Sequence, residues 1–173
     1  MATMILLPSA TATYSSGWVA VGASTHHECL DDDNATTSYS KCSTDGDRLI
    51  IEYANPSVAE ADIASIDSVR FLSSGKAVHR TDPSLVAISF EAPTAGFSET
   101  VSYDVHRTNF ETINGTARTT SDGSSAWTYS DLEALQMMCT KSLTVEVYLS
   151  YLALEVTYTE AAADNAVFFG TNF

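Results

Sequence analysis

The stretch LTVEVYLSYLALEVTY, residues 143–158, decides the fold class of this chain. Its apolar residues stand at odd positions up to Leu149 and at even positions from Leu152 onward. Alternation with a period of two is typical of a β-strand with one face in a core, so the change of parity predicts a β-bulge or a crossing between two sheets. A third interpretation is that both faces are buried over part of the strand. A long strand of this kind favours a β-sandwich.

Four further segments are rich in β-branched and aromatic residues and predict strands at residues 50–53, 66–78, 85–90 and 101–106. Turn-forming pairs such as Asp45-Gly46 and Asn55-Pro56 lie between them. Short strands separated by such turns are typical of all-β sandwiches and barrels. No segment alternates strand with helix as a parallel nucleotide-binding sheet requires.

One short helix is expected near Asp131 to Met138. Ser130 is the predicted N-cap, and Glu133 at the third helical position would complete a capping box. The apolar residues that follow would pack this helix over an open end of the sandwich.

The composition supports an all-β chain and excludes several partners. Eight basic residues stand against 22 acidic ones in 173 residues, for a formal net charge of −14. Such a chain cannot line a groove that neutralises phosphates, so binding to nucleic acid or to an anionic membrane is not expected. The sequence holds 22 Ser and 21 Thr, so hydroxyl groups replace charges as the polar surface. The charge imbalance suits a saline, marine or halophilic setting, where screening softens self-repulsion.

Catalytic motifs are absent where they would be easiest to see. There is no nucleophile elbow, phosphate-binding loop, dinucleotide fingerprint or His-Glu-x-x-His helix. We therefore expect a protein that is not an enzyme and needs no cofactor. A pair of carboxylates for glycoside hydrolysis stays open as a weaker alternative, because such partners lie far apart in sequence.

Two polar clusters are candidates for metal sites. His26-His27-Glu28-Cys29 lacks a second ligand pair at workable spacing, so a polar loop is the favoured interpretation and no metal site is expected. The acidic run Asp31 to Asn34 is a solvated loop or, less favoured, a calcium site. Cys29, Cys42 and Cys139 follow no disulfide pattern, although a bridge between the first two stays an alternative.

Aromatic residues offer two further hypotheses. Trp18 and Trp127 either close the edge of the core or, with exposed tyrosines, stack sugar rings. Phe168, Phe169 and Phe173 stand in an apolar tail that needs a partner surface, which is the chain's own core or a neighbouring subunit. The expected organisation is an N-terminal arm (residues 1–16), a β-sandwich domain (17–160) and a C-terminal tail (161–173).

Residues 127–135 (WTYSDLEAL) and residues 154–158 (LEVTY) resemble the ending of jelly-roll-like β-sandwich virion proteins of tailed phages. Trp18, the acidic run after Leu30 and the strand opened by Ile66 are similar too, so the likeness spans about residues 17 to 160. The chain departs from that pattern after the helix, where residues 137–139 (MMC) replace the usual glycine.

The resemblance implies a jelly-roll-like antiparallel β-sandwich without catalytic function. It suggests a capsid decoration protein or minor capsid protein, oligomeric and bound to the major capsid protein or other virion subunits. The acidic surface would be repelled by packaged DNA, which favours the outer capsid surface. The alternative, from another class, is a carbohydrate-binding or receptor-binding module of a tail or head fibre.

Overall fold

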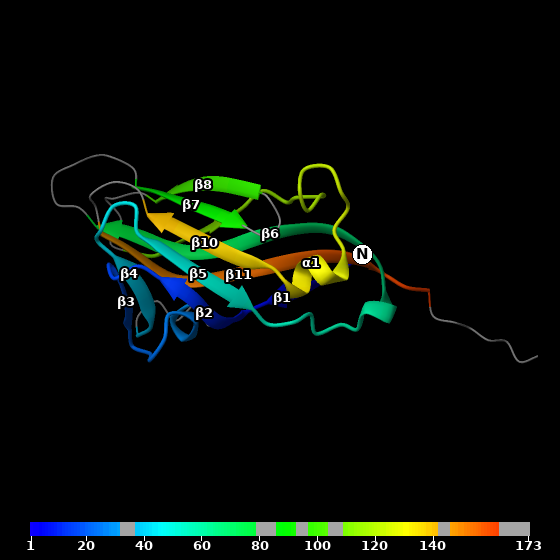
Figure 1. Ribbon diagram of the computed structural model, residues 1–173, viewed down its shortest axis with the longest axis horizontal. Coiled ribbons are helices and arrows are strands. Elements are labelled where there is room, and N and C mark those ends of the chain that lie inside the picture. The colour runs from blue at the N-terminus through cyan, green and yellow to red at the C-terminus, as the bar shows by residue number, and fades with distance from the viewer. Residues whose placement is uncertain (32–36, 79–85, 93–96, 104–108, 142–145, 163–173) are drawn as a thin grey trace, which may run out of the picture.

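The chain folds as two antiparallel β-sheets that pack face to face (Figure 1). This computed structural model describes residues 1–31, 37–78, 86–92, 97–103, 109–141 and 146–162. The strands are β1 (Ala2–Leu6), β2 (Pro8–Tyr14), β3 (Trp18–Val21), β4 (Tyr39–Cys42), β5 (Arg48–Tyr53), β6 (Ile63–Val78), β7 (Val86–Ala92), β8 (Phe97–Tyr103), β9 (Glu111–Asn114), β10 (Gln136–Lys141) and β11 (Glu146–Glu160). The helical elements are α1 (Tyr129–Glu133) and the 3-10 turns η1 (His27–Cys29) and η2 (Glu60–Asp62).

The strand order is that of a jelly roll. The six-stranded sheet has the order β3-β4-β11-β6-β9, with β1 also paired to β11, and the five-stranded sheet has the order β2-β5-β10-β7-β8. From β4 to β11 the chain places β4, β6, β9 and β11 in one sheet and β5, β7, β8 and β10 in the other. Eight strands arranged in this way form the double-sheet jelly roll. The expected all-β, jelly-roll-like sandwich is confirmed.

The parity change in β11 is a bulge. Leu149 pairs with Gly75 and Tyr151 pairs with Ser74, so the register shifts around Ser150. The strand stays in one sheet and pairs with β6 along its length, which excludes the crossing between sheets. Because of the extra residue, Leu149 and Leu152 both face the core and are fully buried. Ser150 is fully buried as well, so both faces are covered at this point.

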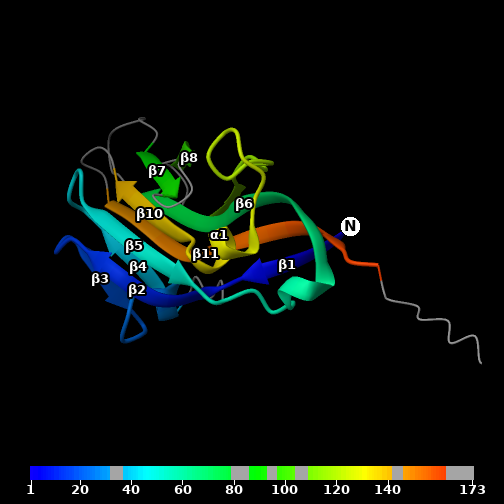
Figure 2. The same cartoon turned by 45° about the vertical axis from the view of Figure 1, so that its right-hand side comes forward.

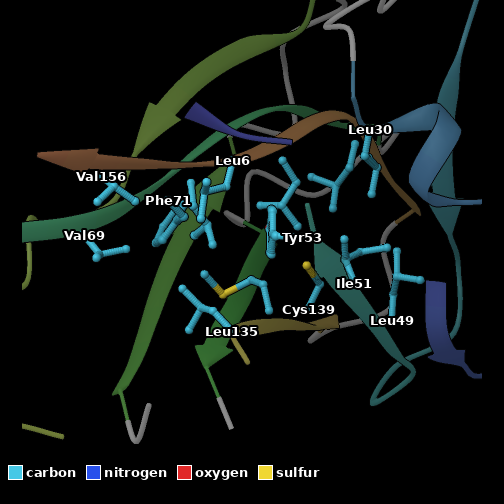
Figure 3. Packing of buried hydrophobic residues seen from close by; sticks show 14 of the residues in the cluster. Leu6, Leu30, Leu49, Ile51, Tyr53, Val69, Phe71, Leu135, Cys139 and Val156 are labelled. Atoms are coloured by element: carbon cyan, nitrogen blue, oxygen red, sulfur yellow. The ribbon is translucent and has the colours of Figure 1, made fainter. Parts of the chain in front are cut away.

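The core lies between the two sheets (Figure 3). Leu6, Phe71 and Val156 project from the six-stranded sheet toward Ile51 and Cys139 of the five-stranded sheet. All five side chains are buried. Full burial of such side chains stabilises the fold by roughly 1.5–3 kcal/mol each, so this layer holds the two sheets together.

The helix is shorter than expected and begins earlier. The N-cap is Thr128, not Ser130: its hydroxyl accepts a 3.2 Å hydrogen bond from the Asp131 N–H, and Asp131 Oδ2 accepts a 2.8 Å bond from the Thr128 N–H. This capping box uses the aspartate, so Glu133 does not complete it. The helix ends at Glu133, and Met138 lies in β10, because residues 136–140 pair with β5 and residues 138–141 pair with β7.

The first 16 residues, expected as an arm, contribute a strand to each sheet, β1 and β2. The chain passes between the sheets at Leu7, whose carbonyl accepts a 2.9 Å hydrogen bond from the Ala54 N–H. Cys29, Cys42 and Cys139 are buried free thiols, so the alternative bridge between the first two is wrong. Among the described residues, none forms a helix with the length and apolar character needed to cross a membrane.

Candidate functional site

Neither tryptophan offers a ring face to solvent. Trp18 is 2% exposed and Trp127 is 4% exposed. The Trp127 Nε1–H donates a 2.8 Å hydrogen bond to the Arg118 carbonyl, which fixes the indole at the core edge. The interpretation of both residues as core closers is confirmed, and neither is a stacking platform on the surface.

The His26–Cys29 cluster is dispersed by η1. His26 Nδ1 lies 3.0 Å from Ser40 Oγ, and His27 Nδ1 lies 3.3 Å from Thr11 Oγ1. Glu28 accepts hydrogen bonds from two backbone N–H groups of the preceding turn, and the Cys29 thiol contacts the Val21 carbonyl. In the described part of the chain, no three His, Cys, Asp or Glu side chains gather as a metal site.

Several predicted residues lie outside the described ranges. Phe168, Phe169 and Phe173 belong to residues 163–173, and the acidic run from Asp31 extends into residues 32–36. The subunit-interface and calcium hypotheses therefore stay predictions.

A pocket opens between the free edges of the two sheets. β2 ends the five-stranded sheet and β3 ends the six-stranded sheet, and the two strands lie side by side in both views (Figures 1 and 2). The cavity has a volume of ≈ 470 Å³, within the range of about 300–1,000 Å³ usual for ligand sites. Its wall is formed by Thr11 and Tyr14 of β2, residues 18–20 of β3 and residues 23–26 of the following turn. We call it the edge pocket.

Tyr14 gives the edge pocket an exposed aromatic face. Its side chain is 56% exposed, and its ring meets the His26 ring edge to face, with centroids 4.5 Å apart. Burial lowers the pKa of His26 because the charged imidazolium would lose its hydration. The imidazole is therefore neutral at pH 7 and supports the tyrosine ring without adding charge.

Trp18 lies in the wall of the edge pocket and carries a buried hydrogen-bond donor. Its side chain is buried in the core, and the Nε1–H has no hydrogen-bond partner among the residues that the structure describes. Leaving a buried donor unsatisfied costs about 1–3 kcal/mol. The nitrogen has almost no exposed surface, so a ligand would reach it only through a movement of the pocket wall.

The edge pocket carries no formal charge in a strongly acidic chain. None of its nine described lining residues is Asp, Glu, Lys or Arg. Two other cavities, of ≈ 590 Å³ and ≈ 510 Å³, are each lined by two carboxylates, from Asp62 and Glu160 and from Glu52 and Glu133. The aromatic residues in these two linings are buried. The edge pocket is therefore the cavity suited to an uncharged ligand with an apolar face.

A second group of aromatic residues lies on the outward side of the six-stranded sheet. The Tyr39 ring centroid is 5.3 Å from that of Tyr148 and 6.4 Å from that of Phe110. Lys76 Nζ lies 4.7 Å from the Phe110 centroid and 5.1 Å from the Tyr148 centroid, close enough for cation–π attraction. We call these four residues the aromatic–lysine cluster.

No protein-family model and no curated relative matches the sequence. Solved structures similar to this chain include a family 16 carbohydrate-binding module, with 13% identity, 82% of this chain and 89% of that chain covered, and a TM-score of 0.40. The CBM22-1 xylan-binding domain of Paenibacillus barcinonensis Xyn10C is 10% identical to this chain. The match covers 92% of this chain and 95% of that domain, with a TM-score of 0.42. The family 29 module CBM29_1 of Piromyces equi is 10% identical, and the match covers 90% of this chain and 91% of that module, with a TM-score of 0.40. Likenesses of this size say nothing of function, and the fold assignment rests on the strand pairing itself.

Sequence reasoning pointed to exposed tyrosines without naming Tyr14, and it gave Lys76 no role. All described residues that line the pocket lie in one short segment, between positions 11 and 26. The sequence does not show that β2 and β3 belong to different sheets. The pocket opens between these two strands.

Proposed function

We propose that this protein is a non-enzymatic binding module for neutral carbohydrate, with the edge pocket as its site. The observation that carries the proposal is the uncharged pocket wall with the exposed Tyr14 ring. A sugar has an apolar face of C–H groups and a rim of hydroxyl oxygens. The tyrosine ring would stack on the apolar face, and the hydroxyl-bearing residues of the wall, such as Thr11 and Ser24, would hydrogen-bond with the rim.

The charge of the chain favours a neutral sugar over other small ligands with oxygen acceptors. A phosphate or carboxylate would enter a pocket without a cation, inside a field set by a net charge of −14. A hydroxyl-bearing ring meets no such repulsion. The pocket therefore selects against anions by omission of lysine and arginine from its wall.

Binding to an array of neutral monosaccharides and oligosaccharides, followed by calorimetric titration, tests the proposal. Tyr14→Ala should reduce affinity at least tenfold, because stacking area is lost while an exposed side chain contributes little to folding. Tyr14→Phe keeps the ring and should bind within about threefold of the wild type. Ile5→Ala is the control, since Ile5 is an exposed apolar side chain of β1 outside the pocket. Absence of binding to every sugar at millimolar concentration would overturn the proposal.

The non-enzymatic part of the proposal has its own test. Glu52 and Glu133 line one cavity, and the Gln136 side-chain amide donates a 2.9 Å hydrogen bond to Glu52 Oε1. We expect no release of reducing ends from any polysaccharide that binds. Release that disappears in Glu52→Gln or Glu133→Gln would identify a hydrolase instead.

The virion role implied by the resemblance stays a prediction. Jelly rolls occur in viral capsid proteins and in lectins, so the topology is compatible with both roles. A glycan-binding module on a fibre or on the outer capsid surface would serve receptor recognition. Identification of the proteins that co-purify with this chain, with their stoichiometry, tests that placement and the expected homo-oligomer.

A further inference from the structure

We propose that the ligand is an oligosaccharide chain that leaves the edge pocket at Val19 and crosses the outward face of the six-stranded sheet to Lys76. The inference deepens the proposed function and rests on it. It assigns a second contact region to the aromatic–lysine cluster and sets the ligand class as a chain of several sugar units.

A row of paired residues connects the two regions. Val19 of β3 pairs with Lys41 of β4, Lys41 pairs with Tyr148 of β11, and Tyr148 pairs with Lys76 of β6. Their neighbours along each strand, among them Trp18 and Val147, are buried or, at Ala20, partly buried, so the four side chains of the row face outward. Val19 is 47% exposed and also lines the edge pocket. The pocket and the row therefore share one residue.

The length of the row sets the size of the ligand. Four neighbouring strands are separated by three intervals of about 4.8 Å, so Lys76 lies about 14 Å from Val19 across the sheet. One pyranose ring cannot reach from the pocket to Lys76. A chain of several units that runs across the strands can contact both.

Charges along the row are arranged so that one cation is left for a ligand. Lys41 Nζ lies 3.1 Å from Glu146 Oε1, and Glu146 Oε2 accepts a 2.7 Å hydrogen bond from the Tyr148 hydroxyl. Lys76 differs, because its ammonium contacts two aromatic rings and has no acceptor or carboxylate partner among the described residues.

An ammonium group has three N–H donors and no acceptor. The rings of Phe110 and Tyr148 hold Lys76 Nζ in place, so little side-chain freedom is lost when it donates to a sugar oxygen. Tyr148 offers part of its ring to the same chain. The row thus provides an aromatic contact and a positioned donor for the same chain.

The test compares chains of one, two, four and six units from one neutral oligosaccharide series found to bind. The affinity of the four-unit chain should exceed that of the single unit by about tenfold or more. Lys76→Met keeps the apolar stem and should remove most of this gain. Arg48→Met is the matched control, because it removes one positive charge from an exposed position on the other sheet and should leave the gain intact.

Amide chemical shifts provide a second measurement on the wild-type protein. Residues around Lys76 and Tyr148 should shift with the four-unit chain and stay unchanged with the single unit. Single-unit binding that depends on Tyr14, with no gain in affinity for longer chains or a gain that Lys76→Met preserves, would overturn this inference alone. Failure of every saccharide to bind would overturn the proposed function together with it.

Discussion

The Tyr148 hydroxyl donates a 2.7 Å hydrogen bond to Glu146 Oε2, and both side chains stand on the outward face of β11. The bond is local, between residues two apart on one strand, and it holds the tyrosine ring beside Lys76. Desolvation raises the pKa of Tyr148 to about 12, and the hydrogen bond to the carboxylate and its charge add to the effect. The pair therefore has a measurable signature in alkaline solution.

We predict that Tyr148 stays protonated in the folded protein at a pH where an unfolded tyrosine has ionised. A folded pKa above the unfolded value near 10 gives a stabilising contribution that is complete below pH 10 and is lost as the pH rises through 12. The difference in tyrosinate absorbance between wild type and Tyr148→Phe should show this titration. Glu146→Gln should lower the pKa of Tyr148. A pKa near 10 in the wild type would contradict the prediction.

A second prediction concerns the bulge in β11. Deletion of Ser150 removes the extra residue and brings Leu152 two positions after Leu149, so the even-numbered apolar residues after it, including Leu154, keep facing the core in regular alternation. Burial of a Leu stabilises the fold by roughly 1.5–3 kcal/mol, and no Leu leaves the core in this variant, so we expect the deletion variant to fold. Ser150→Ala keeps the residue count and should fold. Circular dichroism and thermal unfolding test both variants, and a deletion variant that fails to fold would contradict the bulge.

The bulge was predictable because the period of a strand is two and every residue of the pattern is local. β10 was not predictable in this way, since Met137, Met138 and Cys139 form an unbroken apolar run with no alternation. Its pairing on both sides with β5 and β7 decides its structure, and that pairing is tertiary. The short helix before it was expected, but the capping box began two residues earlier, at Thr128.

The candidate site likewise combines a feature that a local sequence pattern predicts with features that depend on tertiary pairing. Trp18 was predictable as a core residue from its surroundings in sequence. The exposed face of Tyr14 depends on the gap between two sheet edges, and the row from Val19 to Lys76 depends on the register of four strands. Neither feature has a local signal in the sequence, because each is formed only when distant segments pair.

The N-cap assignment leads to a third prediction. Thr128→Ala removes the side-chain acceptor for the Asp131 N–H and should lower the free energy of unfolding by about 1 kcal/mol. Ser130→Ala changes a residue inside the helix and should alter it by less than about 0.5 kcal/mol. Chemical denaturation of both variants compares the two positions directly. A larger loss for Ser130→Ala would restore Ser130 as the N-cap.

The net charge leads to a fourth prediction. Repulsion among the acidic residues of a chain with a formal charge of −14 opposes the compact state, and salt screens it over about 10 Å at 0.1 M. We expect the midpoint of thermal unfolding to rise when sodium chloride is raised from millimolar to molar concentration. Potassium chloride should give the same rise, because screening depends on ionic strength. Indifference to salt would count against the saline setting.

The last prediction concerns the approach of Gly115 to the core. A Cβ at this position would lie 2.3 Å from Phe71 Cε1, and the Gly115 N–H donates a 2.8 Å hydrogen bond to the Phe71 carbonyl. The backbone cannot withdraw without breaking that bond, so Gly115→Ala must displace a fully packed ring. We expect a loss of about 1–3 kcal/mol in the free energy of unfolding.

Phe71→Leu removes the ring atoms that a Cβ would meet and separates the clash from other effects of the alanine. The single variant Phe71→Leu should be destabilised, because it leaves space in the core. In the double variant the added methyl group should occupy part of that space, so the two losses should be less than additive. Chemical denaturation of the four proteins of this cycle gives the interaction energy. Strict additivity would mean that the ring and the position of Gly115 are energetically independent, which contact at this distance does not allow.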